Sequence, residues 1–442
     1  MARERKTTPS GLDSLRPATF VVALAMMLAT AFLAAPAADA QTYTVLHSFT
    51  GVGDGGVPGT NLVMDRAGNL YGTTYDGGTY GLGGVFKLAH GRSGWVLDPL
   101  HDFTATDGSS PSSLIMGPDG ALYGANSGGG GGGSCGSSGC GTVFKLTPPA
   151  TVCKSVDCLW TATILYRFTG QTDGAAPMGV LTYQNGNLYG TTRFGGNVAE
   201  CHGGAEEGGC GVVYQLSPFH GAWTETVLYT FDGSNDGGYP YGGVIFDPAG
   251  NLYGTTSGSS FLGTGKVFEL SPSGSGWTET VLANFGPYGG TQPYFPYAGL
   301  IRDGGGNLYG TTSQGGSSHL GAVFSVSPSN GGWTLTSLYS FNGEYGDGRP
   351  QLADLFMDAA GNLYGTTPGG PGYGNVFQMT PSDGGWSYNN LYSFTDGSDG
   401  GYPLSTVIMD ASGNLYGTTY GGGIQNPQAC TEGCGVVWKI TP

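Results

Sequence analysis

The chain has 442 residues, of which 87 are Gly and only 10% are charged, and its formal net charge is −16. Gly at this level is typical of collagen or of a disordered chain, but the sequence has no three-residue Gly period, and 12% aromatic residues can bury a core. So few basic residues argue against nucleic acids and anionic membranes as partners.

The first forty residues form a separate segment. Basic residues precede the apolar run ATFVVALAMMLATAFLAA, and small residues follow at Ala38 and Ala40. This pattern predicts a secretory signal peptide over residues 1–40, cleaved after Ala40. An uncleaved membrane anchor is the alternative. No later stretch is apolar for long enough to span a bilayer, so we expect residues 41–442 to be secreted, with no integral membrane segment.

A seven-residue motif, GNLYGTT, organises the rest of the chain. It begins at Gly68, Gly186, Gly250, Gly306, Gly361 and Gly413, and a divergent copy, GALYGAN, begins at Gly120. Its tyrosines are Tyr71, Tyr123, Tyr189, Tyr253, Tyr309, Tyr364 and Tyr416, spaced 52 to 66 residues apart. A period of this length indicates one supersecondary unit per repeat, with the differences in length absorbed in loops.

Each repeat contains four short segments with β-favouring residues. In the fourth repeat these are GVIFD (243–247), NLYGTT (251–256), KVFEL (266–270) and WTETVLANF (277–285). DPAG, between the first two, has the residue preferences of a type I turn, with Asp247 in its first position. We therefore interpret this repeated Asp as a turn residue and not as a catalytic acid.

The second segment predicts burial on both faces of its sheet. Leu188 and Tyr189 point to opposite faces, and Gly190 leaves room for another backbone to approach. We prefer packing over ligand stacking as the role of the repeated Tyr. Radially repeated four-stranded antiparallel sheets with covered faces form a β-propeller, so seven repeats predict seven blades in a single domain over residues 41–442.

The two ends of the repeat region predict how the ring closes. YTVLHSF (43–49) resembles a fourth strand that has no preceding partners, and the chain ends on VVWKI (436–440), a third strand with no fourth after it. We expect the N-terminal strand to complete the last blade. An open solenoid would require polar capping repeats, which the sequence lacks.

The eight cysteines fall into four close pairs. An even number in an exported chain favours local disulfides, although spacing alone does not determine the connectivity, and shared zinc sites are the alternative. The pairs are Cys135 with Cys140, Cys153 with Cys158, Cys201 with Cys210, and Cys430 with Cys434.

Chain direction assigns the loops to two faces. Short turns follow the first and third strands, whereas long, irregular loops follow the second strand, and three of the cysteine pairs lie there. Variable loops on a rigid scaffold are where binding usually occurs, so this face is the candidate site.

Acidic and aromatic residues recur in the loops between blades on that face. Asp-Gly followed closely by Pro is explained most simply as a turn, and alternatively as a ring of carboxylates at the channel mouth that holds a cation such as calcium. The aromatic residues nearby suit a sugar or the packing of the loops. The candidate ligand-binding residues are Asp54, Asp107, Asp173, Asp236, Asp347, Asp399, Tyr239, Tyr241, Tyr294, Tyr297 and Tyr402.

One loop contains a dense titratable cluster. His202 lies with Glu200, Glu206 and Glu207 in a Gly-rich loop that cysteines flank, which favours a clamped, solvated loop but also makes it the best enzyme candidate. No nucleophile elbow, zincin helix or phosphate loop occurs. We therefore include His202 among the candidate ligand-binding residues and assign no catalytic residue.

The repeats resemble the GloVer tandem repeat of exported bacterial proteins. The resemblance is carried by GNLYGTT, by the GGVFKL-type strand (83–88) and by the strand that runs from Trp333 to Phe341, and it covers residues 43–442. It implies an extracytoplasmic repeat protein and supplies no catalytic residues. Some relatives end in a sorting segment, whereas this sequence ends in WKITP, which favours release over attachment to the surface.

Together these observations favour a secreted, monomeric binding or interaction module that presents its loop-rich face to a glycan or an extracellular protein. An enzyme that acts on an extracellular polysaccharide and a purely structural repeat protein are the alternatives. We expect no cofactor, with calcium as the metal that the acidic loops would best accommodate.

Overall fold

The computed structural model describes residues 41–442, except residues 60, 93, 150–159, 197–200, 202–207, 260–262, 275, 345–346, 351–352, 371 and 427. The predicted signal peptide (1–40), the pair Cys153 and Cys158, and His202 lie outside the described residues. Residues 43–441 form one compact unit.

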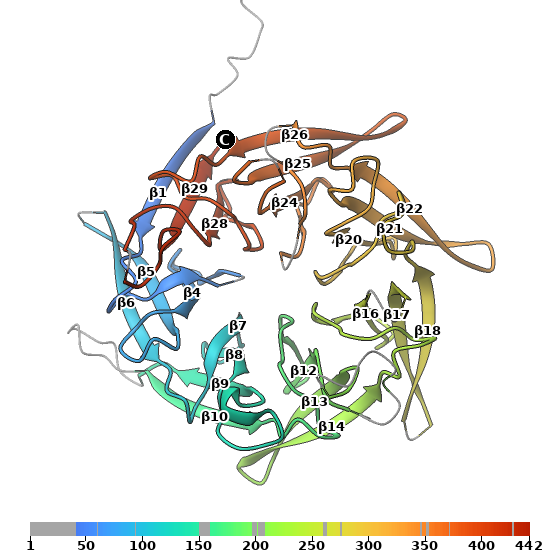
Figure 1. Cartoon of the computed structure of the whole chain (residues 1–442), viewed down its shortest axis with the longest axis horizontal. Coiled ribbons are helices and arrows are strands. Elements are labelled where there is room, and N and C mark those ends of the chain that lie inside the picture. The colour runs from blue at the N-terminus through green and yellow to red at the C-terminus, as the bar shows by residue number, and fades with distance from the viewer. Residues whose placement is uncertain are drawn as a thin grey trace, which may run out of the picture. The chain divides into compact units, whose positions relative to one another are not determined.

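That unit is a ring of seven antiparallel sheets around a central axis (Figure 1). In blades one to six the chain runs from an inner strand near the axis to an outer strand at the rim, whereas in blade seven the N-terminal strand of the chain is the outer strand (Figure 1). The first sheet has a fifth short strand, β2 (Gly56–Pro58), paired with the C-terminal end of β4 (Leu70–Asp76). The prediction of an all-β, seven-bladed propeller is confirmed.

Apart from β1, the strands follow the order of the blades around the ring. Blades one to three contain β2 (Gly56–Pro58), β3 (Val63–Met64), β4 (Leu70–Asp76), β5 (Gly84–Gly91) and β6 (Gly94–Asp102); β7 (Ser109–Met116), β8 (Leu122–Gly128), β9 (Thr142–Thr147) and β10 (Thr161–Arg167); β11 (Thr182–Gln184), β12 (Asn187–Thr192), β13 (Val212–Phe219) and β14 (Ala222–Thr230). Blades four and five contain β15 (Ile245–Phe246), β16 (Leu252–Ser259), β17 (Gly263–Ser273) and β18 (Gly276–Asn284); β19 (Ile301–Arg302), β20 (Leu308–Thr312), β21 (Ala322–Ser329) and β22 (Gly332–Ser340). Blades six and seven contain β23 (Phe356–Met357), β24 (Leu363–Thr367), β25 (Asn375–Ser382) and β26 (Gly385–Ser393); β27 (Ile408–Met409), β28 (Leu415–Thr419), β29 (Val436–Thr441) and β1 (Thr42–Ser48). A short 3-10 helix, η1 (Gly136–Ser138), lies between β8 and β9.

The N-terminal strand closes the ring as predicted. The seventh sheet has the order β1-β29-β28-β27, so the first strand of the chain is the outer strand of the last blade (Figure 1). Phe49, which follows β1, is fully buried, and its N–H donates to the carbonyl of Gly435 at 3.1 Å. The two ends of the chain therefore hold one blade together.

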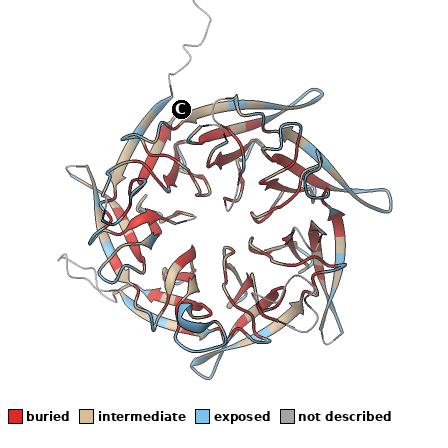
Figure 2. Ribbon diagram, in the orientation of Figure 1, coloured by how far each residue is buried: buried red, intermediate tan, exposed pale blue. Residues whose placement is uncertain are grey.

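The motif strand is buried along most of its length (Figure 2). Leu188 packs toward blade two and Tyr189 toward blade four, in two different core clusters, as the alternation predicts. The expectation that another backbone approaches Gly190 is wrong, because a Cβ there would lie 2.5 Å from the hydroxyl oxygen of Tyr214. Only the divergent copy has a backbone atom this near, the Ser113 carbonyl oxygen, 2.6 Å from a Cβ on Gly124. A Cβ on Gly254 would lie 2.5 Å from the ring of Phe268, so an aromatic side chain of the adjacent strand occupies the space.

The repeated Asp organises the turn that precedes the motif. The Asp247 carboxylate accepts the N–H groups of Ala249 and Asn251 at 2.9 Å, the Asn251 side-chain amide at 3.0 Å and the Tyr253 hydroxyl at 3.2 Å. Burial alone would raise its pKa, but these hydrogen bonds hold the pKa of Asp247 below its usual range. The same arrangement occurs at Asp65, Asp303, Asp358 and Asp410. The repeated Asp and the motif that follows it therefore form a turn and a strand, in agreement with the interpretation of this Asp as a turn residue.

Candidate functional site

The long loops gather on one face of the ring, on which the second strand of each blade ends. Three disulfides clamp them: Cys135–Cys140 between β8 and β9, Cys201–Cys210 between β12 and β13, and Cys430–Cys434 between β28 and β29. Local pairing is therefore confirmed for these three pairs. Each disulfide closes a loop that contacts the next interblade segment. The contacts are hydrogen bonds from the N–H groups of Val57, Ala176 and Tyr239 to the carbonyls of Cys434, Cys140 and Cys210, respectively.

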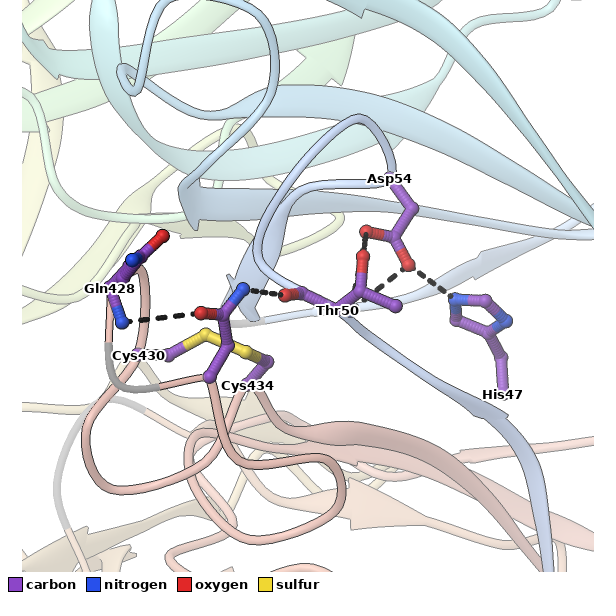
Figure 3. Close-up of a disulfide and its surroundings, with 7 residues drawn as sticks. His47, Thr50, Asp54, Gln428, Cys430 and Cys434 are labelled. Carbon is purple, nitrogen blue, oxygen red and sulfur yellow. Dashed lines mark hydrogen bonds and ion pairs between the residues drawn. A yellow bond between two sulfur atoms is a disulfide. The ribbon is translucent and has the colours of Figure 1, made fainter.

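The interblade aspartates lie toward the outer rim of this face. Asp173 accepts the Thr169 N–H at 2.8 Å and the Thr169 hydroxyl at 2.6 Å, and the Tyr166 hydroxyl of outer strand β10 donates to it at 3.1 Å. Figure 3 shows the corresponding turn in the first interblade loop, where Asp54 accepts from Thr50 and lies 3.3 Å from Nε2 of His47. Each carboxylate therefore structures its own loop.

The remaining four aspartates also have a partner on an outer strand. Asp107 pairs with His101 at 3.0 Å, Asp236 with Tyr229 at 2.9 Å, Asp347 with Tyr339 at 3.5 Å and Asp399 with Tyr392 at 3.1 Å. These pairs place the six carboxylates in six separate junctions. Among the described residues, no group of three or more His, Cys, Asp or Glu side chains is arranged to hold a metal ion.

Two outer-strand glutamates, which the sequence-based prediction missed, face these junctions. Glu225 of β14 lies near Asp173, and Glu279 of β18 lies near Asp236 and Asp232. Burial and the neighbouring carboxylates raise the pKa of each Glu to about 7. Burial and the Asp232 side chain likewise raise the pKa of Asp236 to about 6. The signal in the sequence was the Glu two residues after Trp223 and Trp277, a position where other repeats have Leu97 or Leu335.

Most of the predicted aromatic residues converge over blades three to five. The Arg193 guanidinium lies 4.2 Å from the ring centroid of Phe194 and 4.6 Å from that of Tyr241, and Tyr241 meets Tyr297 edge to face at 4.7 Å. Tyr239 packs against Phe194 at 5.8 Å. These contacts bring together residues that come from three different loops.

The cluster continues into the loop between blades four and five. Phe295 lies 5.9 Å from Tyr297 and 5.1 Å from Tyr294, and the exposed Tyr288 contacts both Tyr294 and Phe295. We call this set the aromatic cluster: Arg193, Phe194, Tyr239, Tyr241, Tyr288, Tyr294, Phe295 and Tyr297. Tyr402, by contrast, lies in the last interblade loop and packs on Tyr373 at 5.8 Å, so the structure does not bring it into the cluster.

A large groove runs beside the aromatic cluster, over blades one to three. Its volume is about 2000 Å³, which exceeds the few hundred to one thousand Å³ of a typical small-molecule pocket. Residues of three successive interblade loops line it, together with the Cys135 loop and Phe194. The lining consists mainly of Gly, Ser, Thr and Ala, and Asp232 is the single charged residue among the described lining residues.

The repeated motif does not predict the position of the groove. Tyr75 at one side is 44% exposed, and Phe194 at the other side also belongs to the aromatic cluster. The run NSGGGGGGSCGSSGC, which was predicted to lie on this face, supplies much of the wall through Gly131, Gly132 and Ser134 to Gly139.

Within the described part of the chain, no helix is long and apolar enough to cross a membrane.

Comparison with solved structures shows the propeller fold alone. A copper-bound fungal alcohol oxidase is 13% identical with a TM-score of 0.53, and the match covers 91% of this chain and 77% of the oxidase. The PQQ-bound aldose sugar dehydrogenase of Streptomyces coelicolor is 12% identical with a TM-score of 0.47, and the match covers 92% of this chain and 99% of the dehydrogenase. At these identities neither activity transfers to this chain.

Comparison with sequence families is more specific. No curated protein matches the chain. The model of the Gloeobacter/Verrucomicrobia repeat matches residues 29–204 and 199–431, which is most of the chain and includes all seven copies of the motif. The chain therefore belongs to the Gloeobacter/Verrucomicrobia repeat family, in agreement with the GloVer resemblance.

Proposed function

We propose that this protein is an exported binding module and that the groove over blades one to three takes a neutral glycan chain. The single observation that carries the proposal is the chemistry of the groove. About 2000 Å³ of space is lined by hydroxyl groups and exposed backbone, with Tyr75 and Phe194 at its sides. Hydroxyls and backbone amides can pair with sugar hydroxyls, and aromatic faces accept the apolar side of a sugar ring.

The shape of the groove supports an extended ligand. It crosses three successive interblade loops, from Tyr75 of blade one to Asp232 after blade three. A small metabolite would fill only part of this volume, since pockets for such ligands are about twofold or more smaller. A chain of sugar units would contact several loops at once, so a rigid ring is a suitable scaffold.

Charge supports a neutral ligand. The chain carries a net charge of −16, and the described groove lining offers no Lys or Arg with which to pair a uronic acid or a sulfate. An anionic polysaccharide would therefore meet repulsion without compensation. Export is supported by the sequence of residues 1–40 and by the three disulfides, which persist in oxidising compartments.

The test is affinity electrophoresis of the mature chain, residues 41–442, in gels that contain soluble neutral polysaccharides: xylan, mannan, laminarin, dextran and hydroxyethyl cellulose. At least one of these should retard the protein, and alginate should not. Tyr75→Ala should raise the dissociation constant about tenfold, because it removes one aromatic contact with the ligand. Phe219→Ala is the matched control, because Phe219 is 63% exposed at the end of β13, on the opposite face.

Two outcomes would overturn the proposal. One is a mature, folded chain that no neutral polysaccharide retards. The other is release of reducing sugars from a polysaccharide that is bound, which would establish the enzyme alternative. Retardation that Tyr75→Ala leaves unchanged would place the binding surface elsewhere on the ring.

A further inference from the structure

Each junction between blades contains one strained residue at the same place. Seven residues that directly precede an interblade proline have a φ angle in the left-handed region, although none is Gly. They are Val57 (56°), Ser110 (53°), Ala176 (53°), Tyr239 (58°), Phe295 (60°), Arg349 (53°) and Tyr402 (56°). We call these the pre-proline positions; there is one at each junction between blades.

This conformation is unfavourable for an L-residue, because its Cβ crowds the backbone. It persists only where the surroundings determine it. At Ala176 the N–H donates to the carbonyl of Cys140 in the preceding blade at 2.9 Å, and the carbonyl accepts from the N–H of Arg193 in its own blade at 3.0 Å. Tyr239 is held in the same way, by Cys210 at 2.9 Å and Ser257 at 3.2 Å. The backbone is thus fixed between two blades.

The same backbone presents very different side chains. The two tyrosines fill their junctions: Tyr239 packs on Phe194 and Cys201 of blade three, and Tyr402 packs on Tyr373 of blade six. Val57 is 5% exposed and lies in the core cluster that contains the Cys430–Cys434 disulfide. At these junctions the side chain closes the space between neighbouring loops.

The small side chains leave their junction open. Ser110 and Ala176 stand at the two junctions that the groove crosses, between blades one and two and between blades two and three, and both line it. The groove ends near the junction of blades three and four, where Tyr239 stands at the equivalent place. The extent of the groove therefore follows the size of the pre-proline residue.

We propose that the pre-proline residues determine specificity, with Ser110 and Ala176 opening two junctions to a glycan chain and Tyr239 setting the limit of the binding site. This inference rests on the proposed function. It adds that the number of sugar units bound depends on which junctions are open.

The chain itself supplies suitable substitutions. Because Tyr occupies the position at residues 239 and 402 with nearly the same φ, Ser110→Tyr and Ala176→Tyr should be compatible with the backbone. Ala176→Ser changes little in size and is the conservative control. Arg349→Ala makes a truncation at the same position in a junction that the groove does not reach.

The experiment measures binding of the mature chain by affinity electrophoresis, with the neutral polysaccharide that retards the wild type. Thermal unfolding is recorded for every variant. Ala176→Tyr and Ser110→Tyr should each weaken binding tenfold or more, whereas Ala176→Ser and Arg349→Ala should bind within twofold of the wild type. Tyr239→Ala should increase the ratio of affinities for long over short oligosaccharides of the same polymer by threefold or more.

The outcomes separate this inference from the proposed function. If the wild type is retarded and both Tyr variants, folded by their melting temperatures, bind as the wild type does, the inference is wrong and the proposed function stands. If the wild type binds nothing, both are wrong. Should one Tyr variant fail to fold, the other decides, because it tests a different junction of the same groove.

Discussion

Tyr43 stacks flat on Tyr392, with ring centroids 3.9 Å apart and ring planes 9° from parallel. The two residues come from opposite ends of the chain, and the Tyr43 hydroxyl also donates to the carbonyl of Asp399 at 2.5 Å. Tyr43 lies in β1, the strand that completes blade seven, and Tyr392 lies in the outer strand of blade six. Closure of the ring therefore includes a side-chain contact to the neighbouring blade as well as strand pairing.

Tyr43→Ala should destabilise the ring closure by about 2 kcal/mol, because it removes a stacked aromatic pair and a hydrogen bond. Hydrogen exchange should become faster in both β1 and β29. Tyr388→Ala is the matched control, since Tyr388 stacks on Tyr339 at 4.3 Å between two blades that the chain joins directly. Faster exchange in that variant should stay near β22 and β26. Equal exchange in β1 and β29 of the Tyr43 variant and the wild type would contradict the closure role.

The contribution of the Asp–Tyr hydrogen bond to stability can be tested by comparing two copies of the motif in the same protein. Tyr253→Phe should cost about 1 kcal/mol of unfolding free energy, because it removes the hydroxyl that donates to Asp247. Tyr189→Phe is the control, since blade three has Tyr183 in place of that Asp. Denaturant unfolding of both variants should show a loss for the first and little change for the second. A similar loss in both would assign the effect to packing.

The motif Gly should tolerate no side chain. Gly254→Ala places a Cβ 2.5 Å from the ring of Phe268, which must shift in a packed core, at a cost of about 2 kcal/mol. Gly276→Ala in the same blade meets no atom within 4 Å and should be close to neutral. Thermal unfolding of the two variants provides the comparison, and a stable Gly254→Ala variant would show that the ring moves aside at little cost.

The outer-strand glutamates predict a pH dependence of stability. Burial, with the nearby Asp173, raises the pKa of Glu225 to about 7, so the folded state favours the protonated carboxyl. The stability that this carboxyl contributes is fully present below about pH 4.5 and is lost as the pH rises through 7. Glu225→Gln should therefore raise the melting temperature by roughly one to two degrees at pH 8 and leave it unchanged at pH 4.

Glu279→Gln should behave in the same way, because Glu279 lies near Asp236 and Asp232 and the pKa of its carboxyl is also raised to about 7. The exposed Asp383, in the turn between β25 and β26, serves as the control, and Asp383→Asn should leave the pH dependence of the melting temperature unchanged. Melting curves from pH 4 to pH 8 decide the matter. Parallel curves for the wild type and Glu225→Gln would mean that the pKa of this carboxyl is the same in the folded and unfolded states.

Local patterns in the sequence were sufficient to predict the fold. The spacing of the motif tyrosines, the Asp turn before each motif, and the unmatched strands at 43–49 and 436–440 together specify seven blades and their closure. Leu188 and Tyr189 were correctly predicted to be buried on opposite faces. These features depend on hydrogen bonds and alternation within a few residues, which the sequence alone determines.

The site depended on contacts between blades, which no local pattern encodes. Chain direction was enough to assign the six interblade aspartates and the loop aromatics to one face. Only the tertiary structure joined Asp173 to Tyr166, separated Tyr402 from the aromatic cluster, and opened a groove where Ser110 and Ala176 are small. The physical reason is that a groove is the space that side chains of neighbouring loops leave unfilled, so it exists only once the ring has set those loops side by side.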